Sequence, residues 1–273
     1  MTLPITLRHR TQYRYERPVR LGPQLLRLHP VPGAPPPILR YVLRITPEPT
    51  QLHWQRDAWG NQVARLVLAG PTATLDFDVE LTADLTPLDP FAFLLDPPAA
   101  TWPIAYDPAT ERDLAPFFET ETGPALTALR AETTGAGQPT IPLILGLAAR
   151  VRDSFAYTTR EEPGTWPVEH TLAQCSGSCR DMAWLLVQLL RRHGIAARFV
   201  SGYLVEPGRA ELHAWAEAFL PGAGWIGFDA TSGFATAEGH IALAATPRVA
   251  EAAPLTGTVE PVPATLTTTL ALA

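Results

Sequence analysis

The sequence contains no lysine, because all 21 of its basic residues are arginine. No lysine amine of the protein can therefore be acylated by the protein's own active site. Cysteine is also scarce: Cys175 and Cys179 are the two thiols. Two cysteines are too few for the disulfide framework of a small secreted protein, so we expect reduced thiols.

Strong charge and long apolar runs are missing as well. The net charge of -6 leaves no basic stripe for a phosphate backbone, which excludes nucleic acid as a partner class. No uninterrupted apolar run approaches the roughly 18 residues of a transmembrane helix, so we expect no membrane partner. Residues 1–6 lack the charged and apolar regions of a secretory signal, which predicts a cytoplasmic location.

What is present predicts an α+β protein of two domains. A chain of 273 residues with 46% hydrophobic residues can form a substantial core. Residues 6–15 and 74–81 alternate apolar and polar side chains, which predicts an antiparallel β-sandwich over residues 1–100. Residues 101–138 are rich in proline and acidic residues and form a predicted connector, with a short helix at 124–132. Residues 139–273 form the second predicted domain, the core, which begins with an amphipathic helix at 141–155.

The clearest local signal is a helix that begins at Cys179. Ser178 and Asp181 have the spacing of a capping box, and Gly194 follows an arginine-rich last turn as a helix stop. The free N–H groups and the dipole of a helix start favour an anion, so this position favours the thiolate form of Cys179. A reactive thiolate is the nucleophile of cysteine enzymes.

A nucleophilic cysteine needs a base and a group that orients the base. Residues 211–219 and 225–229 read as two strands joined by the turn at 221–224. Counting outward from the turn brings Asp229 to a direct or diagonal position opposite His213, within reach of a side-chain hydrogen bond. Alternation places His213 and Trp215 on one face of the strand and alanines on the other.

Simpler interpretations exist for each of these residues. A free cysteine is often a small buried hydrophobe, and a histidine in a strand is often structural. The i, i+4 spacing of Cys175 and Cys179 could place two sulfurs on one helical face as metal ligands. No further cysteine or nearby histidine completes a tetrahedral set, so we predict no metal and no cofactor.

Four motifs around these residues give a family resemblance. They are SGSCRD (176–181), GIAARFVSGY (194–203), HAWAE (213–217) and GWIGFDAT (224–231). Together they resemble the bacterial transglutaminase-like family, and residues 9–30 are similar to its N-terminal β domain. The resemblance implies a papain-like core, with Cys179 as nucleophile, His213 as base and acid, and Asp229 as the orienting carboxylate.

The resemblance also implies a chemistry, and this sequence departs from the family pattern at two positions. It implies acyl transfer at an amide bond of a protein or peptide substrate, at a glutamine side chain or an isopeptide, through a thioester. Trp184 replaces a histidine of many relatives, and Ala230 replaces a proline. The Trp184 form resembles a subgroup in which this region heads a longer polypeptide, so a further C-terminal domain or partner protein is an expected partner. The alternative function is a non-enzymatic protein-binding module that keeps the fold.

Overall fold

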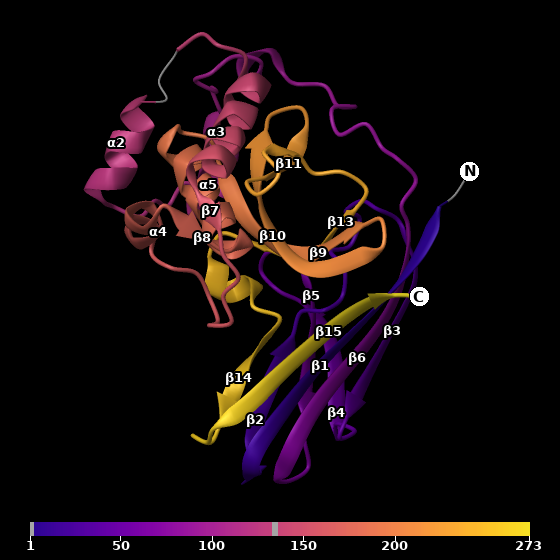
Figure 1. Ribbon diagram of the computed structural model, residues 1–273. Helices are drawn as coiled ribbons and strands as arrows, with labels where there is room; N and C mark the ends of the chain where they lie inside the picture. Colours follow the sequence, from indigo (N-terminus) through magenta and orange to yellow (C-terminus); the bar gives the residue numbers. More distant parts are fainter. Residues whose placement is uncertain (1–2, 133–135) are drawn as a thin grey trace.

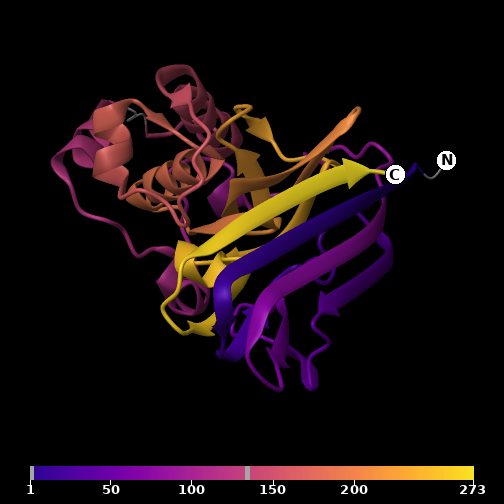
Figure 2. The same cartoon turned by 60° about the horizontal axis from the view of Figure 1, so that its bottom comes forward.

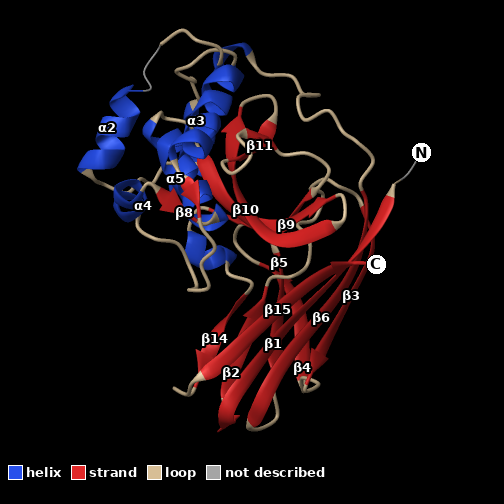
Figure 3. Cartoon of the chain, viewed as in Figure 1, coloured by secondary structure: helices blue, strands red, loops and turns tan. Residues whose placement is uncertain are grey.

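The computed structural model describes residues 3–132 and 136–273, so residues 1–2 of the predicted N-terminal domain and 133–135 of the predicted connector lie outside it. The chain has an α+β fold, with an all-β part below and a helix-covered sheet above in the view of Figures 1 and 3. The predicted fold class is confirmed.

The N-terminal part consists of two four-stranded antiparallel sheets. One has the order β15-β1-β6-β3 and the other β14-β2-β5-β4. Their N-terminal strands are β1 (Pro4–Val19), β2 (Leu21–Leu26), β3 (Ile38–Thr46), β4 (Gln51–Arg56), β5 (Gln62–Val67) and β6 (Thr72–Asp84). On β6 the side chains of Leu75, Phe77 and Val79 are buried in alternation with partly exposed neighbours, as a strand with one covered face requires. The predicted strands at 6–15 and 74–81 lie within β1 and β6.

The last two strands return to this sandwich. β14 (Leu255–Val259) pairs with β2, and β15 (Ala264–Leu272) pairs with β1 from Leu7↔Leu272 to Tyr15↔Ala264. Figure 2 shows the C-terminal strand along the first strand. The predicted core of residues 139–273 therefore needs correction at its C-terminal end. The physical reason is that each strand covers a sheet edge that would otherwise be unpaired, a long-range contact without a local sequence signal.

The predicted connector packs against the core. It contains α1 (Pro108–Asp113) and α2 (Pro124–Glu132), and the bounds of α2 are those predicted. Short 3-10 turns lie at Pro97–Ala99 and Ala115–Phe117. Trp102 and Leu126 are buried in the hydrophobic core of the helical part, and the Trp102 indole donates to the carbonyl oxygen of His193 at 2.7 Å. The segment is therefore fixed to the core.

The core joins three helices to a five-stranded sheet of order β12-β11-β10-β9-β13. Its helices are α3 (Thr140–Ser154), α4 (Val168–Gln174) and α5 (Cys179–Arg192). Its strands are β9 (Ala197–Glu206), β10 (Arg209–Leu220), β11 (Gly224–Asp229), β12 (Phe234–Ala235) and β13 (His240–Thr246), and β7 (Ala156–Tyr157) and β8 (Ser176–Gly177) form a small parallel pair. A last 3-10 turn lies at Val249–Ala252.

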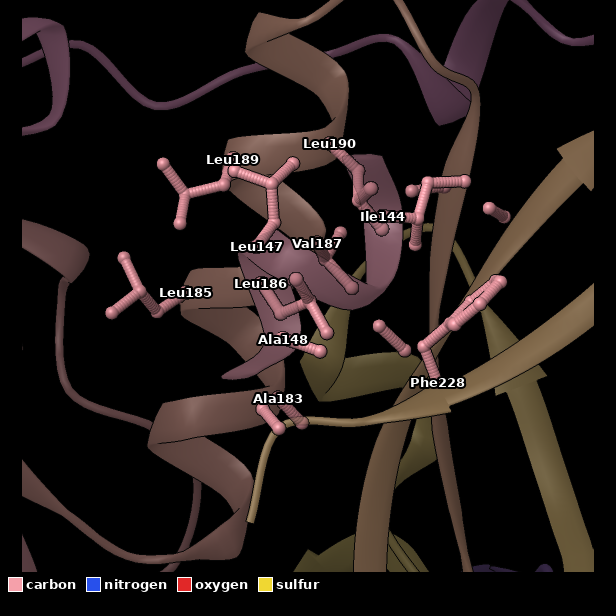
Figure 4. Packing of buried hydrophobic residues seen from close by; sticks show 14 of the residues in the cluster. Ile144, Leu147, Ala148, Ala183, Leu185, Leu186, Val187, Leu189, Leu190 and Phe228 are labelled. Atoms are coloured by element: carbon pink, nitrogen blue, oxygen red, sulfur yellow. The ribbon is translucent and has the colours of Figure 1, made fainter. Parts of the chain in front are cut away.

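Helix α5 is the buried centre of the core. The small side chains of Ala214, Ala216 and Ala218 on β10 lie in the same hydrophobic cluster as α5, so helix and strand can approach closely. Figure 4 shows apolar side chains of α3 and α5, with Phe228 of β11 on the side of α5 opposite Leu185 and Leu189. This packing fixes the start of α5 relative to the β10–β11 hairpin.

The two parts share one apolar cluster. Tyr203 and Val205 of β9 and Ile241 and Leu243 of β13 pack with the interior residues of the sandwich. Strands β9 and β13 of the core sheet therefore pack against the N-terminal sandwich. Among the described residues, no helix combines the length and apolar character that crossing a membrane requires.

Candidate active site

The start of α5 has the predicted form. The helix begins at Cys179, and the Asp181 carboxylate accepts hydrogen bonds from the Ser178 amide at 2.9 Å and the Ser178 hydroxyl at 2.7 Å. Gly194, with φ of 71°, follows the helix as its predicted stop. Cys179 is 8% exposed, so its sulfur lies in the first turn of a fixed helix at the edge of the core.

A buried arginine holds the same carboxylate. Arg160 Nε and Nη2 each donate to Asp181 at 2.9 Å, and the Trp166 amide donates at 2.7 Å. Burial alone raises the pKa of Asp181, but the hydrogen bonds from Arg160 and Ser178 outweigh it and lower the pKa. The carboxylate therefore stays ionised, and it ties the loop before α4 to the start of α5.

The hairpin brings His213 and Asp229 together. The register pairs Ala216 with Phe228, which puts Asp229 diagonally opposite His213. The distance from His213 Nε2 to Asp229 Oδ2 is 3.2 Å, and both side chains are 2% exposed. The predicted diagonal pair is present, and its hydrogen bond fixes the orientation of the imidazole.

The two groups reinforce each other's charge. Burial lowers the pKa of His213, but its hydrogen bond to Asp229, its interaction with Cys179 and the negative charges of both groups raise the pKa to about 10. Burial raises the pKa of Asp229, and its contacts with His213 and His240 outweigh that effect and lower the pKa. The pair is therefore an imidazolium and a carboxylate at neutral pH.

Cys179 interacts with the other side of this pair. Because Nε2 of His213 faces Asp229, Nδ1 is the ring nitrogen left for the sulfur. It is buried, has no hydrogen-bond partner among the described residues, and lies 3.8 Å from Glu211 Oε1. The phenol of Tyr157 is a second neighbour of the thiol: burial and the charges of Cys179 and Glu211 raise the pKa of Tyr157 to about 12. The structure thus brings the three predicted site residues together and adds Tyr157, whose strand pairs with Gly177.

Two further side chains contact Asp229 and were not predicted. The amide and hydroxyl of Thr231 each donate to Asp229 Oδ1 at 2.8 Å, a local turn that the Asp-x-Thr spacing could have indicated. His240 Nε2 lies 3.7 Å from Asp229 Oδ2. His240 comes from β13 through the long-range pairing of β13 with β9, which no local pattern indicates.

Three side chains of this cluster are of the types that bind metal ions: His213, Asp229 and His240. The ligand atoms of His213, Asp229 and His240 lie within 4.8 Å of one another, and imidazole and carboxylate groups suit zinc. The hydrogen bond between His213 and Asp229 already uses two of the three ligand atoms. The i, i+4 sulfur pair does not share a helix face, because Cys175 ends α4 with φ of 47° whereas Cys179 starts α5. Cys175 is exposed and Cys179 is buried.

Comparison with known proteins identifies both parts of the chain. Residues 5–84 match the bacterial transglutaminase-like N-terminal region, and residues 127–230 match the transglutaminase-like superfamily. An uncharacterized protein of Mycobacterium tuberculosis is 27% identical over 242 residues, which are 82% of this chain and 77% of that protein. An uncharacterized protein of Mycobacterium leprae is 26% identical over 266 residues, 91% of this chain and 90% of that protein.

A solved structure has the same fold. It is the crystal structure of a protein from Cytophaga hutchinsonii named as a candidate cysteine protease, with a TM-score of 0.73 and 21% identity. The match covers 100% of this chain and 91% of that chain. At this identity the match establishes the fold and no more. The two family matches, which together cover residues 5–84 and 127–230, identify the chain as a transglutaminase-like protein with the bacterial N-terminal region.

Proposed function

We propose that the protein is a cysteine-dependent acyl-transfer enzyme that acts on amide bonds. The observation that carries the proposal is the buried His213 imidazole, whose Nε2 lies 3.2 Å from Asp229 and whose pKa is raised by both Asp229 and Cys179. A nucleophile, a base in contact with it and a carboxylate that orients the base are the parts that this chemistry requires. The cytoplasmic location stays a prediction from sequence.

The reaction follows from these positions. The Cys179 thiolate attacks the carbonyl carbon of a glutamine side chain, peptide or isopeptide, and the carbonyl oxygen becomes an oxyanion. The protonated His213 gives its Nδ1 proton to the leaving nitrogen, and ammonia or an amine departs to leave a thioester on Cys179. His213 then takes a proton from water or an acceptor amine, which attacks the thioester and expels the thiolate.

The oxyanion is stabilised at the start of α5. Backbone N–H groups of the first helical turn have no partner within the helix and point out of its N-terminus. One donor of this kind is worth about 3 kcal/mol in known oxyanion holes. An ordinary phenol, with a pKa of about 10, is already protonated at neutral pH. Tyr157, which is 55% exposed on the strand that pairs with Gly177, is therefore a further donor in this proposal.

Hydrolysis is the favoured outcome over amine transfer. Water is always present, whereas none of the contacts described around Cys179 forms a binding site for an amine. A mass-spectrometric screen of glutamine-containing and isopeptide-linked peptides, with and without a primary amine, separates the two reactions. We expect conversion of amide to acid by the wild type and by Cys175→Ala, and none by Cys179→Ala. Conversion that persists in Cys179→Ala contradicts the proposal.

A substrate-independent measurement decides between an enzyme and a binding module. The protein is treated with iodoacetamide at a series of pH values, and the alkylation rates of Cys179 and the exposed Cys175 are measured in the same molecule. An activated Cys179 reacts below the pH range of an ordinary thiol, near roughly 8.5, and His213→Ala abolishes this advantage. If Cys179 titrates as an ordinary thiol and His213→Ala changes nothing, the enzyme proposal fails and the binding module is the better interpretation.

A further inference from the structure

His240 belongs to the immediate surroundings of the Cys179–His213–Asp229 cluster. It is the first residue of β13, which lies on the other side of β9 from the β10–β11 hairpin. Its ring nevertheless reaches the cluster: Nε2 lies 3.7 Å from Asp229 Oδ2, and the ring packs edge-on against Trp215 at a centroid distance of 5.2 Å. The side chain is 12% exposed. A second imidazole therefore faces the carboxylate that orients His213.

The hydrogen bonds of His240 define which nitrogen carries the proton. The Ala237 amide donates to His240 Nδ1 at 3.3 Å, so Nδ1 is the acceptor and the ring proton lies on Nε2. Nε2 is buried and has no hydrogen bond within the described part of the chain. A buried N–H without a partner is costly. A shift of a few tenths of an ångström toward Asp229 Oδ2 would provide the partner.

The contacts of Asp229 are divided between its two oxygens. Oδ1 accepts the two hydrogen bonds from Thr231. Oδ2 faces the Nε2 atoms of His213, at 3.2 Å, and His240, at 3.7 Å. With Oδ1 fixed by Thr231, the direction of Oδ2 depends on the groups around it. His240 is the group that approaches Oδ2 from outside the hairpin.

We propose that His240 is a positioning residue: its Nε2–H holds Oδ2 of Asp229 in the orientation that keeps His213 aligned toward Cys179. The inference rests on the proposed function and extends it by one residue. In this proposal the effect of His240 passes through Asp229 and not through a contact with the substrate or the sulfur. Two imidazoles then share one carboxylate oxygen: His213 moves protons, and His240 holds the carboxylate.

A pair of matched variants tests the role. His240→Asn keeps a group near the position of Nδ1 for the Ala237 amide and loses the donor toward Asp229, whereas His240→Gln places an amide near the position of Nε2. The readout is the rate of Cys179 alkylation by iodoacetamide at slightly acidic pH, with Cys175 as the internal standard. We expect His240→Asn to slow Cys179 about tenfold, a typical coupling within one hydrogen-bond network, and His240→Gln to restore most of the rate.

The same variants in an Asp229→Asn background separate positioning from a general structural effect. If His240 acts through Asp229, His240→Asn has no further effect there. The inference is overturned if His240→Asn reacts like the wild type, or if it slows Cys179 by the same factor in both backgrounds. His213→Ala, measured alongside, separates this failure from that of the proposed function. If His213→Ala slows alkylation and His240→Asn does not, only the role of His240 is lost.

Discussion

His213 Nε2 lies 3.2 Å from Asp229 Oδ2 across the β10–β11 hairpin, with both side chains 2% exposed. The contact is diagonal, because the ladder pairs Ala216 with Phe228, one residue before Asp229. A buried carboxylate in this position orients the ring so that its other nitrogen faces the thiol. In the proposed mechanism the reactivity of Cys179 therefore depends on Asp229 through His213.

Replacing Asp229 by asparagine tests this dependence. Asp229→Asn keeps the shape but removes the charge that raises the pKa of His213, and it permits the wrong imidazole tautomer. We expect amidase turnover to fall by roughly 10³–10⁴-fold, as for the equivalent change in serine protease triads. Asp113→Asn, at an exposed position on α1, is the control and retains full activity. An active Asp229→Asn enzyme would remove the orienting role.

The pH dependence of stability should reveal the raised pKa of His213. Its pKa in the folded state is about 10, above the ordinary value near 6.5, so the folded state binds a proton that the unfolded state releases. The stabilisation is complete below about pH 6.5 and is lost as pH rises toward 10, at about 1.4 kcal/mol per pH unit. Urea unfolding of the wild type and His213→Gln over this range measures the slope. Equal slopes in both proteins contradict the assignment.

His9 has the opposite pH dependence in the sandwich. It is buried, with Nδ1 2.9 Å from the Tyr203 hydroxyl and Nε2 2.8 Å from Thr11 Oγ1, and burial lowers its pKa to about 4. The unfolded state therefore binds a proton that the folded state excludes. Its stabilisation is present above about pH 6.5 and is lost as pH falls toward 4.

The variant His9→Gln checks this, since it removes the titrating group. The free energy of unfolding of the wild type is expected to fall between pH 6.5 and 4 more steeply than that of His9→Gln. His53→Gln, at an exposed position on β4, should keep the steepness of the wild type. Because Tyr203 is in β9, the acid transition is expected to loosen the contact between sandwich and core. A slope unchanged by His9→Gln argues against the buried neutral ring.

Local signals in the sequence predicted much of this structure. Capping by Ser178 and Asp181 predicted the start of α5, and the turn at 221–224 predicted the hairpin that pairs His213 with Asp229. These features depend on residues close in sequence. Three features depend instead on pairing between strands that are far apart in sequence. They are the positions of β14 and β15, the position of Tyr157 beside the thiol, and the approach of His240 to Asp229. Many registers satisfy the same alternating pattern, so the sequence alone did not select these contacts.

The buried pair of Arg160 and Asp181 supports the start of α5. Their side chains are 7% and 0% exposed, so Arg160→Met leaves a buried carboxylate without its counter-charge. Loss of one partner of such a pair costs about 3–5 kcal/mol, and we expect a drop of this size in the free energy of unfolding by urea. Arg112→Met, at an exposed position on α1, is the control and should change stability little. If Arg160→Met is as stable as this control, the ion pair does not hold the helix start.

Removal of the last two strands tests the corrected extent of the sandwich. A chain that ends at Pro254 lacks β14 and β15 and exposes the unpaired edges of β2 and β1. Exposed edges pair with other chains, so we expect a lower melting temperature and concentration-dependent aggregation, measured by calorimetry and light scattering. A chain that ends at Ala271 loses only the outermost pair, Leu7↔Leu272, and should remain monodisperse. If residues 255–273 were instead part of an independent catalytic core, the chain ending at Pro254 would keep an intact sandwich. It would then lose activity without aggregating.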